Sequence, residues 1–167
     1  MDTNMEQKCK AYYDSPIGLI EITGAQESLA SLYFVDERSP EYETSEYLQN
    51  CIKQIDEYFQ GKRKEFELNL KPEGTDFQNK VWDELLNIKY GKTMSYNKLS
   101  ELLGDKNAIR AVANANAKNK ISIIIPCHRV IGSNGSLTGY GGGLWRKKWL
   151  LEHEQKFSDG EVQMRLF

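Results

Sequence analysis

The sequence predicts an α+β protein: a small N-terminal α/β unit of antiparallel strands and a helix, followed by a mainly helical, winged-helix-like domain. Strand-forming residues separated by turn residues dominate residues 8–35, whereas the later chain shows helical periodicity. A polar stretch at 71–74 contains proline and glycine and has the composition of a linker. We therefore expect domains at 1–74 and 75–155 and a C-terminal tail at 156–167.

Strands are predicted first. Residues 8–14 and 19–23 form a hairpin around a proline- and glycine-containing turn, and residues 29–35 form a third strand. Alternating apolar residues at 66–70 predict one more short strand. We assign this unit a structural role, because it contains no set of residues of catalytic type.

A helix is predicted between the third strand and the strand at 66–70. Thr44 or Ser45 provides the N-cap, and Gly61 ends the helix. Apolar residues recur at helical spacing and form one face, namely Tyr47, Leu48, Cys51, Ile55, Tyr58 and Phe59.

Helices dominate the second domain. Thr75 caps the first, Ser95 starts the second, which ends at Gly104, and residues 108–117 form the third. The last two have the spacing of a helix-turn-helix, and the second of them is basic and rich in small residues. Such a helix can lie close to nucleic acid, although plain core packing is the alternative.

The charge distribution favours a polyanionic partner. Residues 1–74 carry 8 basic and 15 acidic residues, a net charge of −7, whereas residues 75–155 carry 12 and 7, a net charge of +5. No acidic residue occurs between Lys106 and Leu151. A field of one sign of this kind attracts nucleic acid. The alternative is a solvated basic face balanced by the acidic domain.

The most reactive side chains follow an apolar run at 121–125, which predicts a buried strand or an extended core segment. Pro126 ends this run, and Cys127 and His128 follow directly. A thiolate is a nucleophile, and a nearby imidazole lowers the pKa of a thiol. Glycine-rich loops at 133–143 allow close approach of a ligand. The alternative is a small buried cysteine beside a surface histidine.

A final helix is predicted over 144–153, with Trp145, Trp149 and Leu150 packed inward. The basic run from Arg146 to Lys148 is expected to face solvent or phosphate.

Three widely spaced cysteines and only two histidines make a metal site unexpected. The sequence shows no signal peptide and no apolar stretch of membrane length, which favours a cytoplasmic location.

Taken together, the residues resemble the family of O6-alkylguanine-DNA alkyltransferases, also called methylated-DNA–protein-cysteine methyltransferases. The sequence Ile-Pro-Cys-His-Arg-Val at 125–130 is the signature of this family. The helix pair, the thiol motif, the glycine loop and Glu154 occur in the expected order. The resemblance covers residues 75–155 as motif and the N-terminal unit in layout.

The resemblance implies a role for each matching residue. Cys127 is the alkyl acceptor, His128 takes the thiol proton through a water, and Glu154 orients the imidazole. Asn119 braces the active-site turn, and Tyr96 hydrogen-bonds the flipped base.

The resemblance also implies the residues that contact DNA and the base. Arg110 fills the space that the flipped base leaves in the duplex. The other DNA-binding positions are Ala108, Ala111, Ala115 and Arg129, and the pocket is formed by Val130, Tyr140, Gly141 and Gly142.

Two positions depart from the family pattern. Lys120 stands where some relatives have proline, so the turn after Asn119 is expected to be less rigid. Gly141 stands where some have serine, so only a backbone N–H is available there for the guanine oxygen. The N-terminal unit lacks the zinc ligands of some relatives, and we expect no metal or other cofactor.

The implied activity is DNA repair by a single-turnover methyltransferase. The alkyl group of O6-methylguanine, with O4-methylthymine as the alternative lesion, passes irreversibly and stoichiometrically to the cysteine. The expected partner is double-stranded DNA containing alkylated guanine, bound by a monomer without a membrane. Two other hypotheses are a helix-turn-helix regulator without chemistry, which leaves Cys127 unexplained, and a cysteine hydrolase, which leaves the helix pair unexplained.

Overall fold

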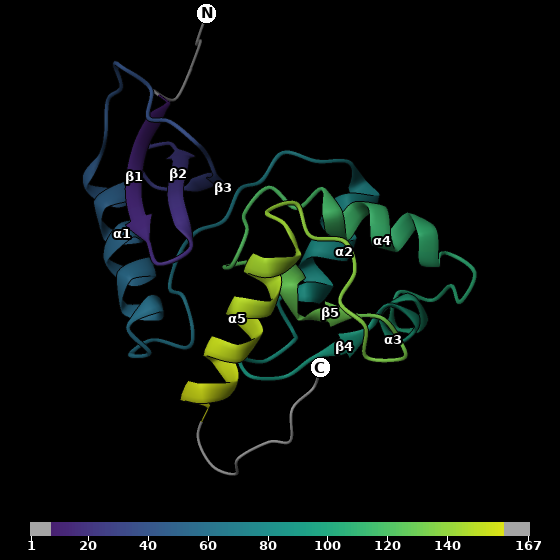
Figure 1. Ribbon diagram of the computed structural model, residues 1–167. Coiled ribbons are helices and arrows are strands. Elements are labelled where there is room, and N and C mark those ends of the chain that lie inside the picture. The colour runs from purple at the N-terminus through teal and green to yellow at the C-terminus, as the bar shows by residue number, and fades with distance from the viewer. Residues whose placement is uncertain (1–7, 159–167) are drawn as a thin grey trace, which may run out of the picture. The chain divides into compact units, whose positions relative to one another are not determined.

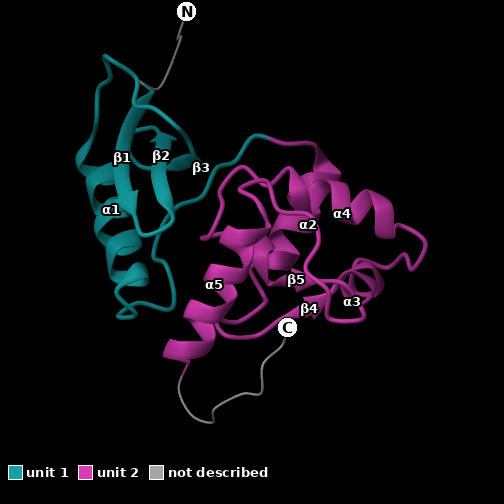
Figure 2. Ribbon diagram, viewed as in Figure 1, with its two compact units in different colours: residues 1–73 teal, residues 74–167 magenta. Residues whose placement is uncertain are grey.

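The computed structural model describes residues 8–158 and consists of two compact units, divided between residues 73 and 74 (Figure 2). The first unit is an antiparallel sheet with one helix, and the second is mainly helical (Figure 1). The predicted fold class is therefore confirmed. The tail predicted at 156–167 begins inside the last helix, which ends at Phe157, and residues 159–167 lie outside the described part.

Unit 1 contains a three-stranded antiparallel sheet in the order β1 (Cys9–Ser15), β2 (Gly18–Gly24) and β3 (Leu29–Phe34). Helix α1 (Glu46–Phe59) packs against β1 and β2 with its apolar face. Ser45 is its N-cap, because the side chain accepts a hydrogen bond from Leu48 N at 3.2 Å.

The strand predicted at 66–70 is wrong. Only Leu70 makes a bridge, to Leu29. The side chain of Gln54 instead bonds both backbone groups of Glu67, receiving a hydrogen bond from its N–H at 2.9 Å and donating one to its carbonyl at 3.3 Å. The buried side-chain amide of Gln54 thus satisfies backbone groups that, in a strand, would bond to a neighbouring strand.

Unit 2 begins with α2 (Asp76–Leu85), where Thr75 and Gln78 form a capping box. Strand β4 (Met94–Ser95) leads into α3 (Tyr96–Leu102), which is capped by Ser95. Helix α4 (Ile109–Ala117) packs against α2 and α3. The indole of Trp82 on α2 donates to the carbonyl of Ala115 on α4 at 2.9 Å. Ala115 is also buried, and its predicted place among the DNA-binding residues stays a prediction.

The remaining elements carry the reactive residues. A short 3-10 helix, η1 (Cys127–Arg129), leads into β5 (Val130–Ile131), which pairs in parallel with β4. Helix α5 (Leu144–Phe157) packs against η1.

The apolar run at 121–125 is buried as expected, but it forms tight turns, with Ile125 N bonded to Ile121 O at 3.1 Å. Ile123 has φ 71°, which a β-branched residue rarely adopts, so a straight strand is excluded.

Two expectations for α5 are wrong. Trp145 is 58% exposed rather than packed inward, and Lys147 is 0% exposed rather than facing solvent. The helix turns by 100° per residue, so one member of the basic run points into the unit.

Candidate active site

Cys127 begins η1 and is only 4% exposed. Its backbone N–H bonds to Ile125 O at 2.8 Å, and Arg129 N bonds to Pro126 O at 3.0 Å. These bonds close a tight turn directly after the strained segment. The turn fixes the direction in which the thiol leaves the backbone.

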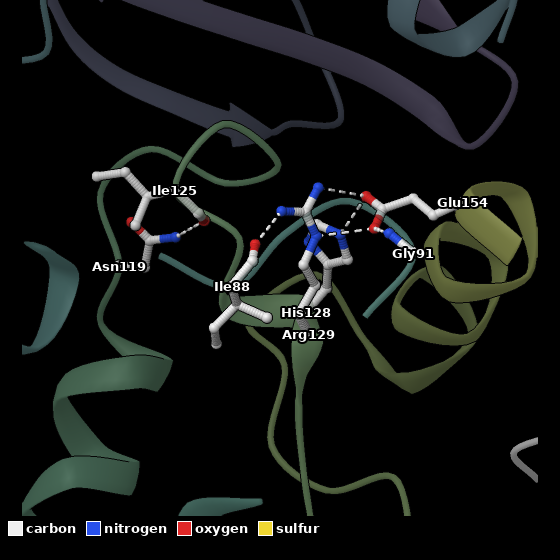
Figure 3. A network of polar contacts seen from close by, with 7 residues as sticks. All are labelled: Ile88, Gly91, Asn119, Ile125, His128, Arg129 and Glu154. Carbon is white, nitrogen blue, oxygen red and sulfur yellow. Dashed lines mark hydrogen bonds and ion pairs between the residues drawn. The ribbon is translucent and has the colours of Figure 1, made fainter. Parts of the chain in front are cut away.

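Asn119 supports this turn from the segment that precedes it (Figure 3). Its Nδ2 donates to Ile125 O at 2.7 Å and to Ile121 O at 3.2 Å, while its Oδ1 accepts from Ile121 N at 3.0 Å. One side chain thus bonds three buried backbone groups of the turns at 121–125. The neighbouring Lys120 does not disturb this bonding.

Glu154 on α5 holds the two residues that follow the cysteine (Figure 3). Its Oε2 lies 2.7 Å from His128 Nε2, and its Oε1 lies 2.8 Å from Arg129 Nε. The Arg129 guanidinium also donates to Glu154 Oε2 at 3.1 Å and to Ile88 O at 2.5 Å. Arg129 is buried and its donors are used inside the protein, and its predicted role as a DNA-binding residue stays a prediction.

The charges of this cluster follow from its contacts. Burial raises the pKa of Glu154, but His128 and Arg129 outweigh burial, and the net pKa lies well below the usual range. Burial lowers the pKa of His128 against the attraction of Glu154, so the imidazole is neutral. Because Nε2 carries the proton that faces the carboxylate, Nδ1 is an acceptor. Within residues 8–158, this buried Nδ1 has no hydrogen-bond partner.

The thiol of Cys127 is under opposing influences. Burial raises its pKa, whereas hydrogen bonding by Asn119, the charge of Lys147 and the backbone N–H groups of Cys127 and His128 lower it. Lys147 donates from Nζ to Val130 O at 2.6 Å and to Thr138 O at 2.7 Å. Its own pKa is lowered to about 8 by burial, although the cysteine favours the charged form.

Tyr96 and the predicted pocket residues Val130, Tyr140, Gly141 and Gly142 lie in the same unit as this thiol. The hydroxyl of Tyr96, at the start of α3, donates to Thr138 O at 3.2 Å. Val130 is buried, and Tyr140 is close enough that a charge on Cys127 would raise its pKa, which burial already raises well above its usual range. A Cβ at Gly141 would lie 3.7 Å from Ala117 O, so this loop passes beside the end of α4. Gly142 contributes its carbonyl to Arg146 at 2.9 Å.

Helix α4 exposes part of the surface expected to contact DNA. Arg110 and Ala111 are exposed and Ala108 is half-buried. Arg110 forms no hydrogen bond or ion pair with any residue between 8 and 158, so its guanidinium is available to another molecule.

Sequence reasoning missed Lys147 as a site residue. Lys147, Leu150, Leu151 and Glu154 have the spacing i, i+3, i+4 and i+7, which places them on one helix face. Because the sequence already assigned Glu154 to the site, this spacing is the signal that could have identified Lys147 as its neighbour on the same helix face.

Neither a metal site nor a membrane span is found among residues 8–158. In the described part of the chain, no cluster of three or more histidine, cysteine or acidic side chains is arranged to hold a metal ion. Across the same residues, no helix has both the length and the apolar character needed to cross a bilayer.

A buried thiol with a neutral base and an ionised carboxylate, in one unit with a helix-turn-helix, defines a class of protein: a DNA-binding protein that carries a cysteine nucleophile. Comparison with known proteins gives the family. The chain belongs to the 6-O-methylguanine DNA methyltransferase family, whose DNA binding domain matches residues 76–156 and whose ribonuclease-like domain matches residues 8–72. This membership confirms the resemblance inferred from the sequence.

Individual relatives agree. The chain is 42% identical over 156 residues to a methylated-DNA–protein-cysteine methyltransferase of Mycolicibacterium paratuberculosis, covering 90% of this chain and 94% of the relative. It is 43% identical to one of Methanosarcina acetivorans, covering 86% and 96%.

Solved structures show the same likeness. The O6-methylguanine methyltransferase of Mycobacterium tuberculosis has a TM-score of 0.83 and 40% identity, with 93% of this chain and 98% of that chain covered. The M. tuberculosis protein OGT in complex with DNA has a TM-score of 0.80 and 43% identity, covering 88% and 92%. The chain is a methylated-DNA–protein-cysteine methyltransferase, a DNA-binding repair enzyme.

Proposed function

We propose that Cys127 accepts the methyl group of O6-methylguanine from double-stranded DNA, once and irreversibly, after the damaged base is flipped out of the duplex. The observation that carries this proposal is the geometry of the buried His128, which directly follows Cys127 in sequence. Its Nε2 lies 2.7 Å from Glu154 Oε2, and its Nδ1 has no hydrogen-bond partner among residues 8–158. A histidine held in this way is a base for a thiol proton.

The transfer follows from these groups. The thiol proton passes to His128 Nδ1 through a bridging water, and the thiolate attacks the methyl carbon in line. The sulfur–carbon bond forms as the bond to the guanine oxygen breaks, and hydrogen bonding by Tyr96 stabilises the charge that develops on the base. The imidazolium returns its proton to the solvent or the base. The thioether is stable, so each protein molecule acts once.

Flipping makes the methyl carbon accessible, because the carbon cannot be reached inside the stacked duplex. The cost is a few kcal/mol and is smaller for a poorly paired base. Arg110 lies exposed on α4 and occupies the space left by the base, with the small side chains of that helix in the minor groove. The protein acts as a monomer in the cytoplasm, where thiols remain reduced.

Intact-mass analysis after incubation with an oligonucleotide duplex containing O6-methylguanine tests the proposal. We expect one methyl group per protein, located on the Cys127 peptide, and none with unmethylated duplex. A regulator would gain no methyl group, and a hydrolase would release product repeatedly with Cys127 unmodified. Either result contradicts the proposal.

A second experiment tests the role of Arg110. The Arg110→Ala variant should repair duplex DNA at least about tenfold more slowly than the parent at subsaturating DNA. It should react with free O6-methylguanine at the parent rate, because only a duplex has a gap to fill. Single-turnover rates on both substrates measure the difference. Equal losses on both would remove Arg110 from base flipping.

A further inference from the structure

A second asparagine lies between Tyr96 and the backbone of the nucleophile. Asn116 belongs to α4 and is 1% exposed. Its Nδ2 lies 3.4 Å from Tyr96 Oη and 3.4 Å from the carbonyl oxygen of Cys127. Because a carbonyl oxygen only accepts, the amide nitrogen must face Cys127. Asn116 therefore donates to both groups from the helix expected to contact DNA.

This contact determines the direction of the Tyr96 hydroxyl. A phenol has one proton, and the Tyr96 proton is donated to Thr138 O at 3.2 Å. Asn116 donates to the same hydroxyl, so the phenolic oxygen is the acceptor on the α4 side. The O–H bond of Tyr96 therefore points toward the glycine-containing loop, where a Cβ at Gly139 would lie 3.6 Å from Tyr96 Oη.

The Tyr96 hydroxyl can also give up its hydrogen bond to Thr138 O without leaving that carbonyl unsatisfied. Thr138 O receives a second hydrogen bond, from Lys147 Nζ at 2.7 Å. If the Tyr96 hydroxyl turned toward a bound base, this carbonyl would still be satisfied. The hydroxyl oxygen thus keeps the hydrogen bond that it accepts from Asn116, whereas the hydrogen bond that it donates can pass from Thr138 O to a bound base.

Stability alone does not explain an asparagine at this position. Its Oδ1 is buried and has no hydrogen-bond partner within residues 8–158. A buried acceptor without a partner destabilises the fold, and an apolar side chain of similar volume would avoid that cost. The presence of asparagine is therefore explained by the hydrogen bonds that its Nδ2 donates to Tyr96 Oη and Cys127 O.

We propose that Asn116 is a positioning residue for methyl transfer, holding the Tyr96 hydroxyl so that its proton is directed at the flipped guanine. This role rests on the proposed function of Cys127. The hydrogen bond from Asn116 also opposes the rise in the Tyr96 pKa that burial causes, which makes the phenol a better donor. No comparable donor to Tyr96 Oη comes from any other described residue.

The test combines two substitutions. Asn116→Leu keeps the volume and removes both donors, and we expect single-turnover transfer at saturating duplex DNA to slow by about tenfold. In a Tyr96→Phe background the same substitution should change the rate by less than about twofold, because no hydroxyl is left to position. Asn116→Asp, which keeps the shape but not the donors, should also slow transfer. The control Asn87→Leu changes an exposed asparagine of the same unit and should leave the rate unchanged.

Thermal or urea unfolding separates this role from a structural one. Asn116→Leu should be as stable as the parent or more stable. Equal slowing with and without the Tyr96 hydroxyl, a normal rate in both Asn116 variants, or slowing matched by lost stability would overturn the proposal. If the parent protein itself gains no methyl group, the proposed function fails instead.

Discussion

The interior of unit 1 and the η1 turn of unit 2 each contain a buried cysteine, yet the two thiols have different surroundings. Cys51 is 0% exposed on α1, and burial raises its pKa to about 12, opposed only by its own backbone. Cys127 is almost as buried, but Asn119, Lys147 and two backbone N–H groups oppose the effect of burial. Depth therefore does not distinguish an inert thiol from a reactive one, whereas polar neighbours do.

The largest expected effect comes from replacing the two cysteines in turn, which tests the comparison directly. Cys127→Ser should reduce methyl transfer by more than about a thousandfold, because a serine hydroxyl is a far weaker nucleophile. Cys51→Ser should transfer at the parent rate and lose about 1–3 kcal/mol of stability from its buried hydroxyl. Single-turnover transfer and urea unfolding measure both. A comparable loss of transfer per folded molecule in the two variants would contradict the comparison.

The next effect concerns the carboxylate. Glu154→Gln removes the charge that pairs with Arg129 and orients His128, so transfer should slow by about a hundredfold and stability should fall by about 3–5 kcal/mol. Affinity for DNA at fixed salt should change little. The control Glu152→Gln alters an exposed ion pair with Lys148 on the same helix and should cost less than about 1 kcal/mol. A normal transfer rate in Glu154→Gln would leave His128 oriented by another group.

The smallest effect concerns Lys147 and depends on pH. Its folded pKa of about 8 lies below the usual 10.5, so between these values the unfolded state binds more protons and stability rises with pH, by up to about 3 kcal/mol. Lys147→Met should abolish this rise, so the stability of the variant relative to the parent should fall between pH 8 and 10. At neutral pH its transfer should slow by about tenfold, because the thiolate loses a positive neighbour.

Lys148→Met is the matched control for this prediction, since it removes an exposed ammonium from the adjacent position. It should leave both the pH dependence and the transfer rate unchanged. Parallel pH profiles for the parent and Lys147→Met would show that Lys147 does not titrate in this range.

Local chemistry made the helix ends predictable from the sequence. Ser45, Thr75 and Ser95 each cap a helix, because an N-cap needs only a short side chain and its next few backbone N–H groups. Motif order likewise predicted Cys127 and Glu154 in one site, and the structure brings Glu154 to His128, the residue after Cys127. The N-caps depend on residues close in sequence, and the motif order depends on the resemblance to a known family.

Features set by distant groups were not predictable in the same way. The run at 121–125 has the composition of a strand, but the side chain of Asn119 takes the place of a ladder partner. Arg129 is one of a set of basic residues in this half of the chain, and its guanidinium bonds inside the unit to Glu154, 25 residues later in the chain. Composition shows that a residue is charged, but its location depends on where its partner lies.

The burial of the Cys127 thiol has a consequence for the lifetime of the protein. In the proposed single-turnover mechanism, a protein molecule is useful only if its thiol is still intact when it meets a damaged base. With 4% of the residue exposed, oxidants and small electrophiles in solution have little access to the sulfur. In the proposed mechanism, by contrast, the duplex itself brings the flipped base to the thiol. Shielding thus preserves each molecule for a damaged base, and the number of intact thiols in a cell sets how many lesions it can remove before new protein is made.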